Sequence, residues 1–234
     1  MPQHPACNTV ALARRLRTAA LLLLVCAPNC GCINAGVMFG KVFFGNPMVK
    51  SAFEARTGVS LMEEDRKVAV VCTAPSSVVA EFDSLQYDLQ EEVTRRMRLR
   101  EMNVASDDEV IGALNDAGGR FAKDALAAAL PDVDYIIHID IEKFTHTEDG
   151  NPNLYRGRSN GIVYAYEVDH GPDAGGSPRA LQVFYQEFTT EYPKAAPASA
   201  ENMSVRVFRQ KCVDQLADVV GRTFYDVETS ELFD

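Results

Sequence analysis

The sequence predicts an α+β domain, α/β-like in its first half, in which helices pack on a mixed sheet of about five strands. Three observations support this fold class. Residues 68–72 form a continuous apolar run, typical of a strand that is covered on both faces. Residues 134–144 alternate between apolar and polar side chains, as a half-buried strand does. Residues 82–97 and 205–220 carry apolar side chains at three- and four-residue spacing, as amphipathic helices do. The predicted order is β-α-β-α-(α)-β-β-β-α.

The first half of the domain contains the shorter elements. After the helix at 82–97, residues 103–105 are predicted to form a short strand. Ser106 and Glu109 have the spacing of a capping box, which predicts a helix that begins there and runs through residue 114. A third helical stretch covers residues 121–130 and is closed by Pro131.

The second half consists of long strands. In the strand at 134–144, one face is apolar, whereas the other carries mostly polar residues that we expect to meet solvent. Two further strands are predicted at 154–169 and 180–192, joined by a Gly- and Pro-rich loop that is too long for a tight turn. A loop at 193–200 then leads to the closing helix.

The first 32 residues resemble a bacterial secretory signal peptide. Arg14, Arg15 and Arg17 precede an apolar run of roughly ten residues, about half of what a membrane-spanning helix needs. The run is followed at once by cysteines, which is typical of lipoprotein signals. The sequence therefore predicts a signal peptide at 1–32, an apolar tether at 33–62 and a single globular domain at 63–234.

Three cysteines compete as the lipid-modified residue. Cys26 has Leu23 three positions before it but follows Val25, and Cys30 matches the lipoprotein pattern at neither position. Cys32 follows Gly31, a small residue as the pattern requires, and is favoured. Ile33 would then be the second residue of the mature chain, which by the lipoprotein sorting rule implies the periplasmic side of the outer membrane. The alternative is an ordinary signal cleaved between residues 31 and 36, which leaves a periplasmic or secreted protein.

The charge of the chain excludes nucleic acid as a partner. The formal net charge is −10, and loss of the three signal arginines leaves 20 basic against 33 acidic residues, a net charge of −13. Such a domain repels phosphate backbones. Four arginines at residues 95–100 lie at the C-terminal end of a predicted helix, where cations complement the helix dipole. Cys72 and Cys212 remain in the mature chain, either as a disulfide or as two buried thiols.

Several segments together resemble a superfamily of bacterial envelope lipoproteins. This superfamily includes the curli-secretion lipoprotein, LpoB and the N-terminal domain of TolB. The similarity covers residues 65–226 and is carried by the following segments: the strand Lys67–Val71, Leu85, Gln90 and Val93 in the long helix, Val104–Leu114, the helix at 125–130 and the strand entry at 132–137. The resemblance implies this fold, an envelope location and a non-enzymatic protein that acts by binding. The polar loop at 171–177 departs from the membrane-spanning hairpins of pore-forming members.

The residues with potential chemistry are few. His138, Asp140 and Glu142 lie on one face of a predicted strand, which is one way to hold a metal ion, and His146, Glu148 and Asp149 follow in the next loop. The competing interpretation is an ordinary polar strand face. The sequence lacks the nucleophile-elbow, zinc-protease, P-loop and dinucleotide motifs, so we expect neither an enzyme nor a cofactor.

Aromatic residues concentrate in the last three strands. Tyrosine is favoured at interfaces because it buries area and keeps a polar tip, and Tyr155, Tyr164 and Tyr166 are therefore candidate partner-binding residues. The sequence predicts an envelope lipoprotein, anchored in the membrane by lipid, whose domain binds another envelope component in an assembly, export or synthase-activator type role. The alternative is a soluble periplasmic protein that binds a metal or ligand through residues 138–149.

Overall fold

The computed structural model describes residues 47–62, 66–171 and 178–232. Of these, residues 49–227 belong to one compact unit, and residues 47–48 and 228–232 belong to a second, small one. In the small unit, Thr229 donates from its backbone N and its Oγ1 to the carbonyl of Pro47, at 3.0 and 2.7 Å. Thr229 opens the 3₁₀ helix η2 (Thr229–Leu232). The predicted signal peptide with Cys26, Cys30 and Cys32, and residues 33–46 of the predicted tether, lie outside the described residues.

The unit at 49–227 is built on a five-stranded mixed sheet, which confirms the predicted fold class. Its strands are β2 (Val68–Thr73), β3 (Tyr135–Glu148), β4 (Asn151–Asp169), β5 (Arg179–Tyr192) and β6 (Ala198–Ser199). The order across the sheet is β2-β3-β4-β5, and β6 pairs with β4. The β2–β3 pair is parallel, and the other pairs are antiparallel.

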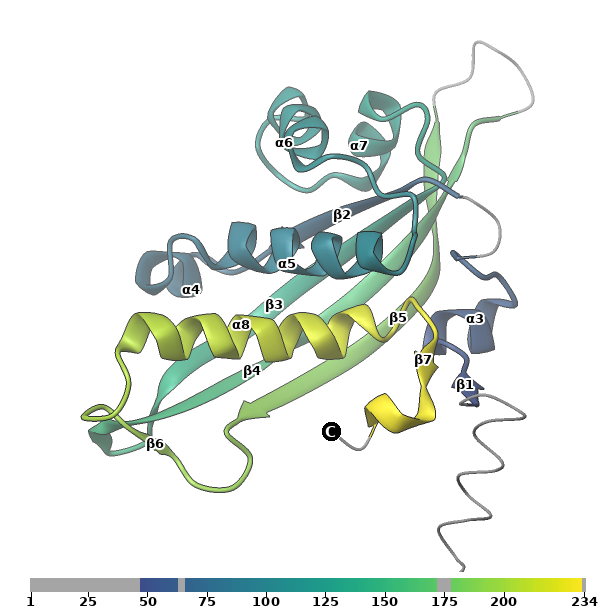
Figure 1. The fold of residues 1–234 in the computed structure, drawn as a ribbon. Coiled ribbons are helices and arrows are strands. Elements are labelled where there is room, and N and C mark those ends of the chain that lie inside the picture. Colours follow the sequence, from purple (N-terminus) through teal and green to yellow (C-terminus); the bar gives the residue numbers. More distant parts are fainter. Residues whose placement is uncertain (1–46, 63–65, 172–177, 233–234) are drawn as a thin grey trace, which may run out of the picture. The chain divides into compact units, whose positions relative to one another are not determined.

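Helices cover both faces of this sheet. They are α3 (Ala52–Thr57), α4 (Ser76–Glu81), α5 (Leu85–Leu99), α6 (Asp107–Asp116), α7 (Lys123–Ala129) and α8 (Val205–Gly221). Figure 1 shows α5 and α8 side by side across one face, and α6 and α7 together at one end of the strands. Two-residue strands, β1 (Met48–Val49) and β7 (Val227–Glu228), lie at the ends of the chain's described part.

Local sequence signals explain where some predicted elements begin and why others differ from the prediction. Ser106 caps α6 by accepting a hydrogen bond from the backbone N of Glu109 at 3.2 Å, as the capping box predicts. The predicted strand at 103–105 is reduced to one parallel bridge between Val104 and Val68. The reason is that Ser106 starts a helix immediately afterwards. The fifth strand is instead β6, which lies within the predicted loop at 193–200.

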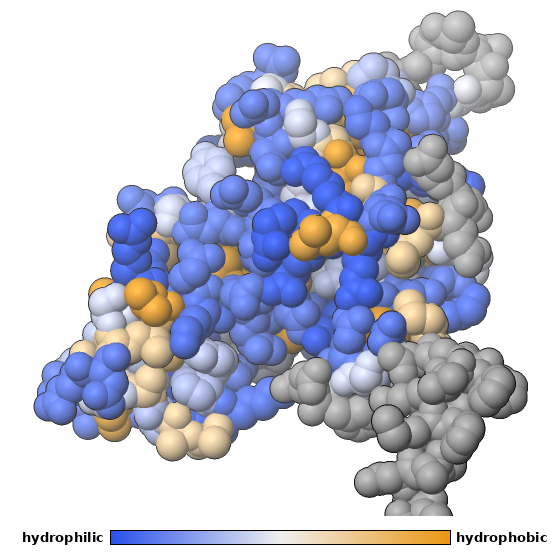
Figure 2. Space-filling view, in the orientation of Figure 1, coloured by the Kyte–Doolittle hydropathy of each residue, from blue (hydrophilic) through white to orange (hydrophobic). Residues whose placement is uncertain are grey.

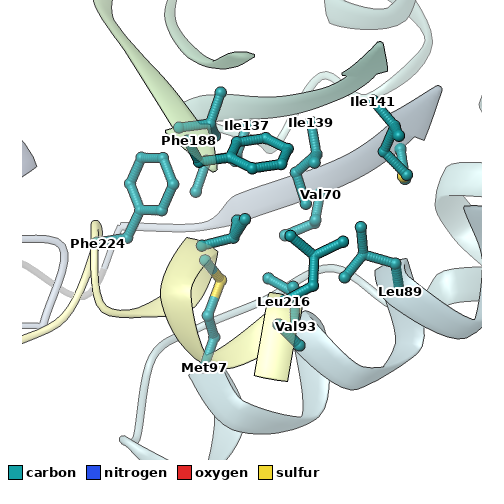
Figure 3. Packing of buried hydrophobic residues seen from close by; sticks show 14 of the residues in the cluster. Val70, Leu89, Val93, Met97, Ile137, Ile139, Ile141, Phe188, Leu216 and Phe224 are labelled. Atoms are coloured by element: carbon teal, nitrogen blue, oxygen red, sulfur yellow. The ribbon is translucent and has the colours of Figure 1, made fainter. Parts of the chain in front are cut away.

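The apolar core forms two clusters, one on each face of the sheet. The larger cluster lies between the sheet and α5 and α8, and Figure 3 shows Val70, Ile137 and Ile139 of the strands packed against Leu89 and Leu216 of these helices. The smaller cluster includes Ile136 and Val168 and lies between the opposite face and α6 and α7. Both sides of β2 are therefore buried, as its continuous apolar run predicts.

The segment just before the predicted domain start also contributes to the core. Phe53 and Leu61 are 0 and 1% exposed. Ser51 caps α3 by accepting from the backbone N of Glu54, and Gly58 ends it with a φ of 76°. Residues 49–62, which the sequence assigns to the tether, thus belong to the same compact unit as the sheet. Within the described ranges, no helix combines the length and the hydropathy that crossing a membrane requires.

Candidate functional site

The face of the sheet opposite α5 and α8 is covered only in part by the described helices. At one end of the strands, α6 and α7 bury this face. Further along, three strands present two rows of paired side chains. His138, Tyr164 and Tyr185 form one row, and Asp140, Ile162 and Glu187 form the next. We call Asp140, Ile162, Tyr164, Tyr185 and Glu187 the open face, because each of them is partly or fully exposed.

Aromatic side chains form a continuous group that runs from the covered end onto the open face. The ring of Phe121, from the loop between α6 and α7, stacks on His138 with centroids 3.7 Å apart. His138 and Tyr164 lie 5.8 Å apart at an interplanar angle of 18°. Tyr185 is directly opposite Tyr164 in the β4–β5 register and is 58% exposed. The group thus begins in the core and ends at solvent.

The side chains of the predicted polar face are therefore not all in solvent. His138 is only 7% exposed, because Phe121 covers it. The expectation that His138 meets solvent is therefore wrong. The cause is the loop between α6 and α7, which packs Phe121 against the ring. Burial lowers the pKa of His138 to about 4, although the nearby Asp140 carboxylate opposes that shift. His138 is consequently neutral at pH 7.

A short chain of hydrogen bonds links His138 to Asp140 through Thr73. The Thr73 hydroxyl donates to Asp140 Oδ1 at 3.0 Å and lies 2.8 Å from His138 Nε2. Because the hydroxyl has one proton, His138 Nε2 is the donor in the second bond. The other imidazole nitrogen, Nδ1, is buried without a partner in the described structure. A nucleophile–base–acid triad has its histidine in the middle, whereas here the threonine is in the middle, so the three residues do not form such a triad.

The predicted metal ligands are not brought together. Glu142 is exposed and accepts a hydrogen bond from the side-chain amide of Asn160 at 2.8 Å, and His138 Nε2 is engaged by Thr73. Across residues 47–62, 66–171 and 178–232, no three His, Cys, Asp or Glu side chains are grouped as a metal site would require. Metal binding by His138, Asp140 and Glu142 stays a prediction, which the metal content of the purified protein would test.

The three predicted partner-binding tyrosines lie on different faces. Tyr164 and Tyr166 lie on the same face with ring centroids 6.2 Å apart, but Tyr166 is 8% exposed and belongs to the smaller core cluster. Tyr155 lies on the other face and packs against Phe208 of α8 at 5.2 Å. The exposed tyrosine of the group is Tyr185, which the sequence prediction did not include. The signal that could have found it is the register of the β4–β5 hairpin, in which Tyr185 is the direct partner of Tyr164.

Charged residues border the open face. They lie at the end of β3, in the first half of β4 and at the end of β5. Arg158 Nη2 donates to Glu148 at 2.8 Å, and Arg156 pairs with both Glu148 and Glu191. The hydrogen bond from Arg158 lowers the pKa of Glu148, and that from Arg156 lowers the pKa of Glu191. All four groups stay charged at neutral pH, so the open face has a polar border.

The two mature cysteines are separate buried thiols, which decides between the two alternatives that the sequence left open. Both are free and buried. Burial raises the pKa of Cys72 and raises the pKa of Cys212 to about 12, so neither is a thiolate at neutral pH.

The chain has likenesses among solved structures but not among family models. No protein-family model matches it, and neither does any curated protein. Similar solved structures include the hypothetical protein CT253 from Chlamydia trachomatis (12% identity, 68% of this chain and 96% of that chain covered, TM-score 0.41). Lipoprotein GNA1162 from Neisseria meningitidis is another (10% identity, 65 and 99% covered, TM-score 0.37). A PelC dodecamer from Paraburkholderia phytofirmans also matches (6% identity, 76 and 96% covered, TM-score 0.37).

These structures include bacterial lipoproteins, the class that the sequence resembles. With TM-scores below 0.5 and identities of 6 to 15%, they assign neither a family nor a function to this chain.

Proposed function

We propose that this chain is a non-catalytic lipoprotein of the bacterial cell envelope whose globular unit binds another envelope protein through the open face. The observation that supports it most directly is the aromatic pair Tyr164–Tyr185, which reaches solvent beside half-buried Ile162. Tyrosine and apolar side chains inside a charged border are the usual composition of a protein interface.

The opposite face of the sheet has a different character. The helices α5 and α8 cover it, and Figure 2 shows their outer surface as mostly hydrophilic, with apolar residues scattered among polar ones. On the open face, in contrast, Tyr164 and Tyr185 are direct register partners beside Ile162, so one partner can bury them together. Arg156, Arg158, Glu148 and Glu191 supply charges of both signs at its border, which favours a protein partner over a surface of one charge.

The location rests on the N-terminal segment. An acylated Cys32 would hold the protein on the periplasmic side of the outer membrane, with Ile33 as the second mature residue. Each buried methylene of an acyl chain contributes about 0.8 kcal/mol, so several chains anchor a domain firmly.

Labelling with radioactive palmitate tests the anchor. We expect the wild-type protein to incorporate label and the Cys32→Ser variant to lose it, whereas Cys26→Ser and Cys30→Ser keep it. Label that survives Cys32→Ser assigns the acylation to another cysteine. A wild-type protein that never incorporates label contradicts the lipoprotein proposal.

Site-specific photo-cross-linking in cells tests the partner face. A photoreactive phenylalanine derivative at Tyr185 is expected to give a discrete adduct, and the additional substitution Ile162→Asp is expected to abolish it. The same derivative at Leu99, which is 69% exposed at the end of α5, is the matched control and should give none. Identical adducts from both positions, or an adduct unaffected by Ile162→Asp, would contradict the assignment of this face.

A further inference from the structure

A hollow of about 310 Å³ lies between α5 and α6 at the carboxyl end of β2, and its lining residue Thr73 is hydrogen-bonded to Asp140 of the open face. Residues 71–74 of β2 and its exit form the base, and α5 and α6 form two walls. The loop at 119–121 forms the rim. Its volume falls within the range of small-molecule sites, and crevices at the carboxyl ends of strands are where α/β sheets commonly bind ligands.

The charge of this hollow differs from that of the chain. The protein has 33 acidic residues, yet none is among the described residues that line the hollow. Arg120 is the charged residue of that lining, and its guanidinium makes no hydrogen bond or ion pair within the described structure. The hollow therefore favours an anionic group, and Arg120 is free to bind it.

A second polar group of the lining, the side-chain amide of Gln90, can donate a hydrogen bond to a ligand there. Gln90 of α5 lines the hollow and is 5% exposed. Its Oε1 accepts a hydrogen bond from the backbone N of Cys72 at 3.4 Å, at the outer edge of β2. Its Nε2 makes no hydrogen bond to any described residue. The amide nitrogen is therefore available to an acceptor in the hollow, while the oxygen of the same amide stays fixed on β2.

The wall formed by α6 is apolar and is held in place by the loop that follows α6. Ile111 and Leu114 of α6 line it together with Phe121. Gly118 and Gly119 have φ values of 89° and 72°, in the left-handed region that glycine tolerates, and they turn the chain back over the sheet. This turn brings Arg120 to the rim and stacks Phe121 on His138, so the apolar wall is anchored to the sheet.

We infer that this hollow binds a small carboxylate with an apolar body, the carboxylate between Arg120 and the side-chain amide of Gln90 and the body against Ile111 and Leu114. The inference goes beyond the proposed function and does not depend on the open face. Such a group comes either from the C-terminal end of a peptide or from a free monocarboxylic acid. The two sources share the chemistry that the hollow recognises.

Isothermal titration of the purified protein with four probes tests the inference. These are N-acetyl-leucine, its amide, N-acetyl-alanyl-leucine and 4-methylpentanoate. We expect the carboxylates to bind and the amide to bind at least tenfold more weakly, because it lacks the charge. Tighter binding of the dipeptide identifies a peptide end, whereas equal binding of 4-methylpentanoate identifies a free acid.

Two variants locate the binding in the hollow. Arg120→Gln is expected to weaken the binding of N-acetyl-leucine roughly tenfold or more. The control Arg206→Gln removes the same charge from an exposed position of α8 and should leave the affinity unchanged. Gln90→Glu keeps an acceptor for Cys72 but replaces the donor by a negative charge, and is expected to abolish binding with an unchanged circular dichroism spectrum. Equal affinity for the acid and its amide, an unaffected Arg120→Gln variant, or no binding of any carboxylate at millimolar concentration would overturn the inference.

Discussion

At the scale of single residues, His138 shows how much burial changes a polar group. Phe121 covers the ring, Thr73 Oγ1 accepts a hydrogen bond from its Nε2, and its Nδ1 is buried without a partner in the described structure. A protonated imidazole would place a charge where water is excluded, which is why burial lowers its pKa to about 4. The fold therefore tolerates this histidine only in its neutral form.

This burial predicts a loss of stability in mild acid. In the unfolded chain the pKa of a histidine is about 6.5, so the unfolded state takes up a proton that the folded state refuses as the pH falls from about 6.5 to about 4. Stability contributed by neutral His138 is thus complete above pH 6.5 and is lost through that window. Denaturant titrations at pH 7.5 and 4.5 should show that His138→Gln reduces the acid-induced loss by on the order of 2 kcal/mol.

The exposed His170 provides the control, because His170→Gln removes a histidine without removing a buried one. Its acid-induced loss should equal that of the wild type. If His138→Gln and the wild type lose the same stability between the two pH values, His138 is not buried in neutral form.

At the scale of elements, the pair α5–α8 is joined by an apolar seam and by one cation. Leu89, Val93 and Leu216 are fully buried between the helices and the sheet. Above them, Arg96 of α5 donates to Glu92 of its own helix at 3.0 Å and to Asp218 of α8 at 3.2 Å, and it also pairs with Asp214. The arginine run at 95–100 is expected to complement the helix dipole, and one of its residues, Arg96, also links α5 to α8.

Removal of this cation should weaken the helix pair measurably. Arg96 is 21% exposed and has three acidic partners. Arg96→Gln removes the cation that pairs with Asp214 and leaves Asp218 with Arg222 alone, and it should cost about 1 to 2 kcal/mol in the free energy of unfolding. Its neighbour Arg95 also pairs with Glu92 but is 54% exposed, so Arg95→Gln should cost less than about 0.5 kcal/mol. Chemical denaturation at low salt measures both, and equal effects would mean that the contact between the helices contributes nothing.

At the scale of the whole molecule, the compact unit begins earlier than its sequence indicates. Phe53 lies in the predicted tether, yet its ring contacts Tyr135, Phe184 and Phe224 at centroid distances of 5.7, 5.6 and 5.8 Å. These partners come from three different parts of the chain. A single short helix before the sheet thereby closes one end of the larger core cluster.

The substitution Phe53→Ala tests this boundary. Removal of a fully buried phenylalanine typically costs 3–5 kcal/mol, and we expect a loss of about that size in the free energy of unfolding. Val49→Ala is the control, because Val49 is 40% exposed and its truncation should cost less than about 1 kcal/mol. A loss below 1 kcal/mol for Phe53→Ala would mean that residues 49–62 do not stabilise the compact unit and belong to the tether.

Patterns with a short period predict most of the fold from sequence. The alternation at 134–144 and the helical spacing at 82–97 and 205–220 become β3, α5 and α8, because each pattern follows from the geometry of one element. The candidate sites are less predictable. Phe121 covers His138 although 17 residues separate them, and nothing local to either residue indicates the contact. Arg120 and Gln90 likewise line the same hollow although they are far apart in sequence, and no local pattern indicates it.

The sequence by itself determined the fold class, the order of the main elements and the signal-like N-terminus, since these depend on composition and local periodicity. Only the tertiary structure decided which face of the sheet stays open, which of the tyrosines reaches solvent and that the two cysteines stay apart. Those properties depend on which face of the sheet each helix covers. The alternation of apolar and polar side chains along a strand does not tell which face that is. Burial is a property of what covers a residue, and the covering residues lie elsewhere in the chain.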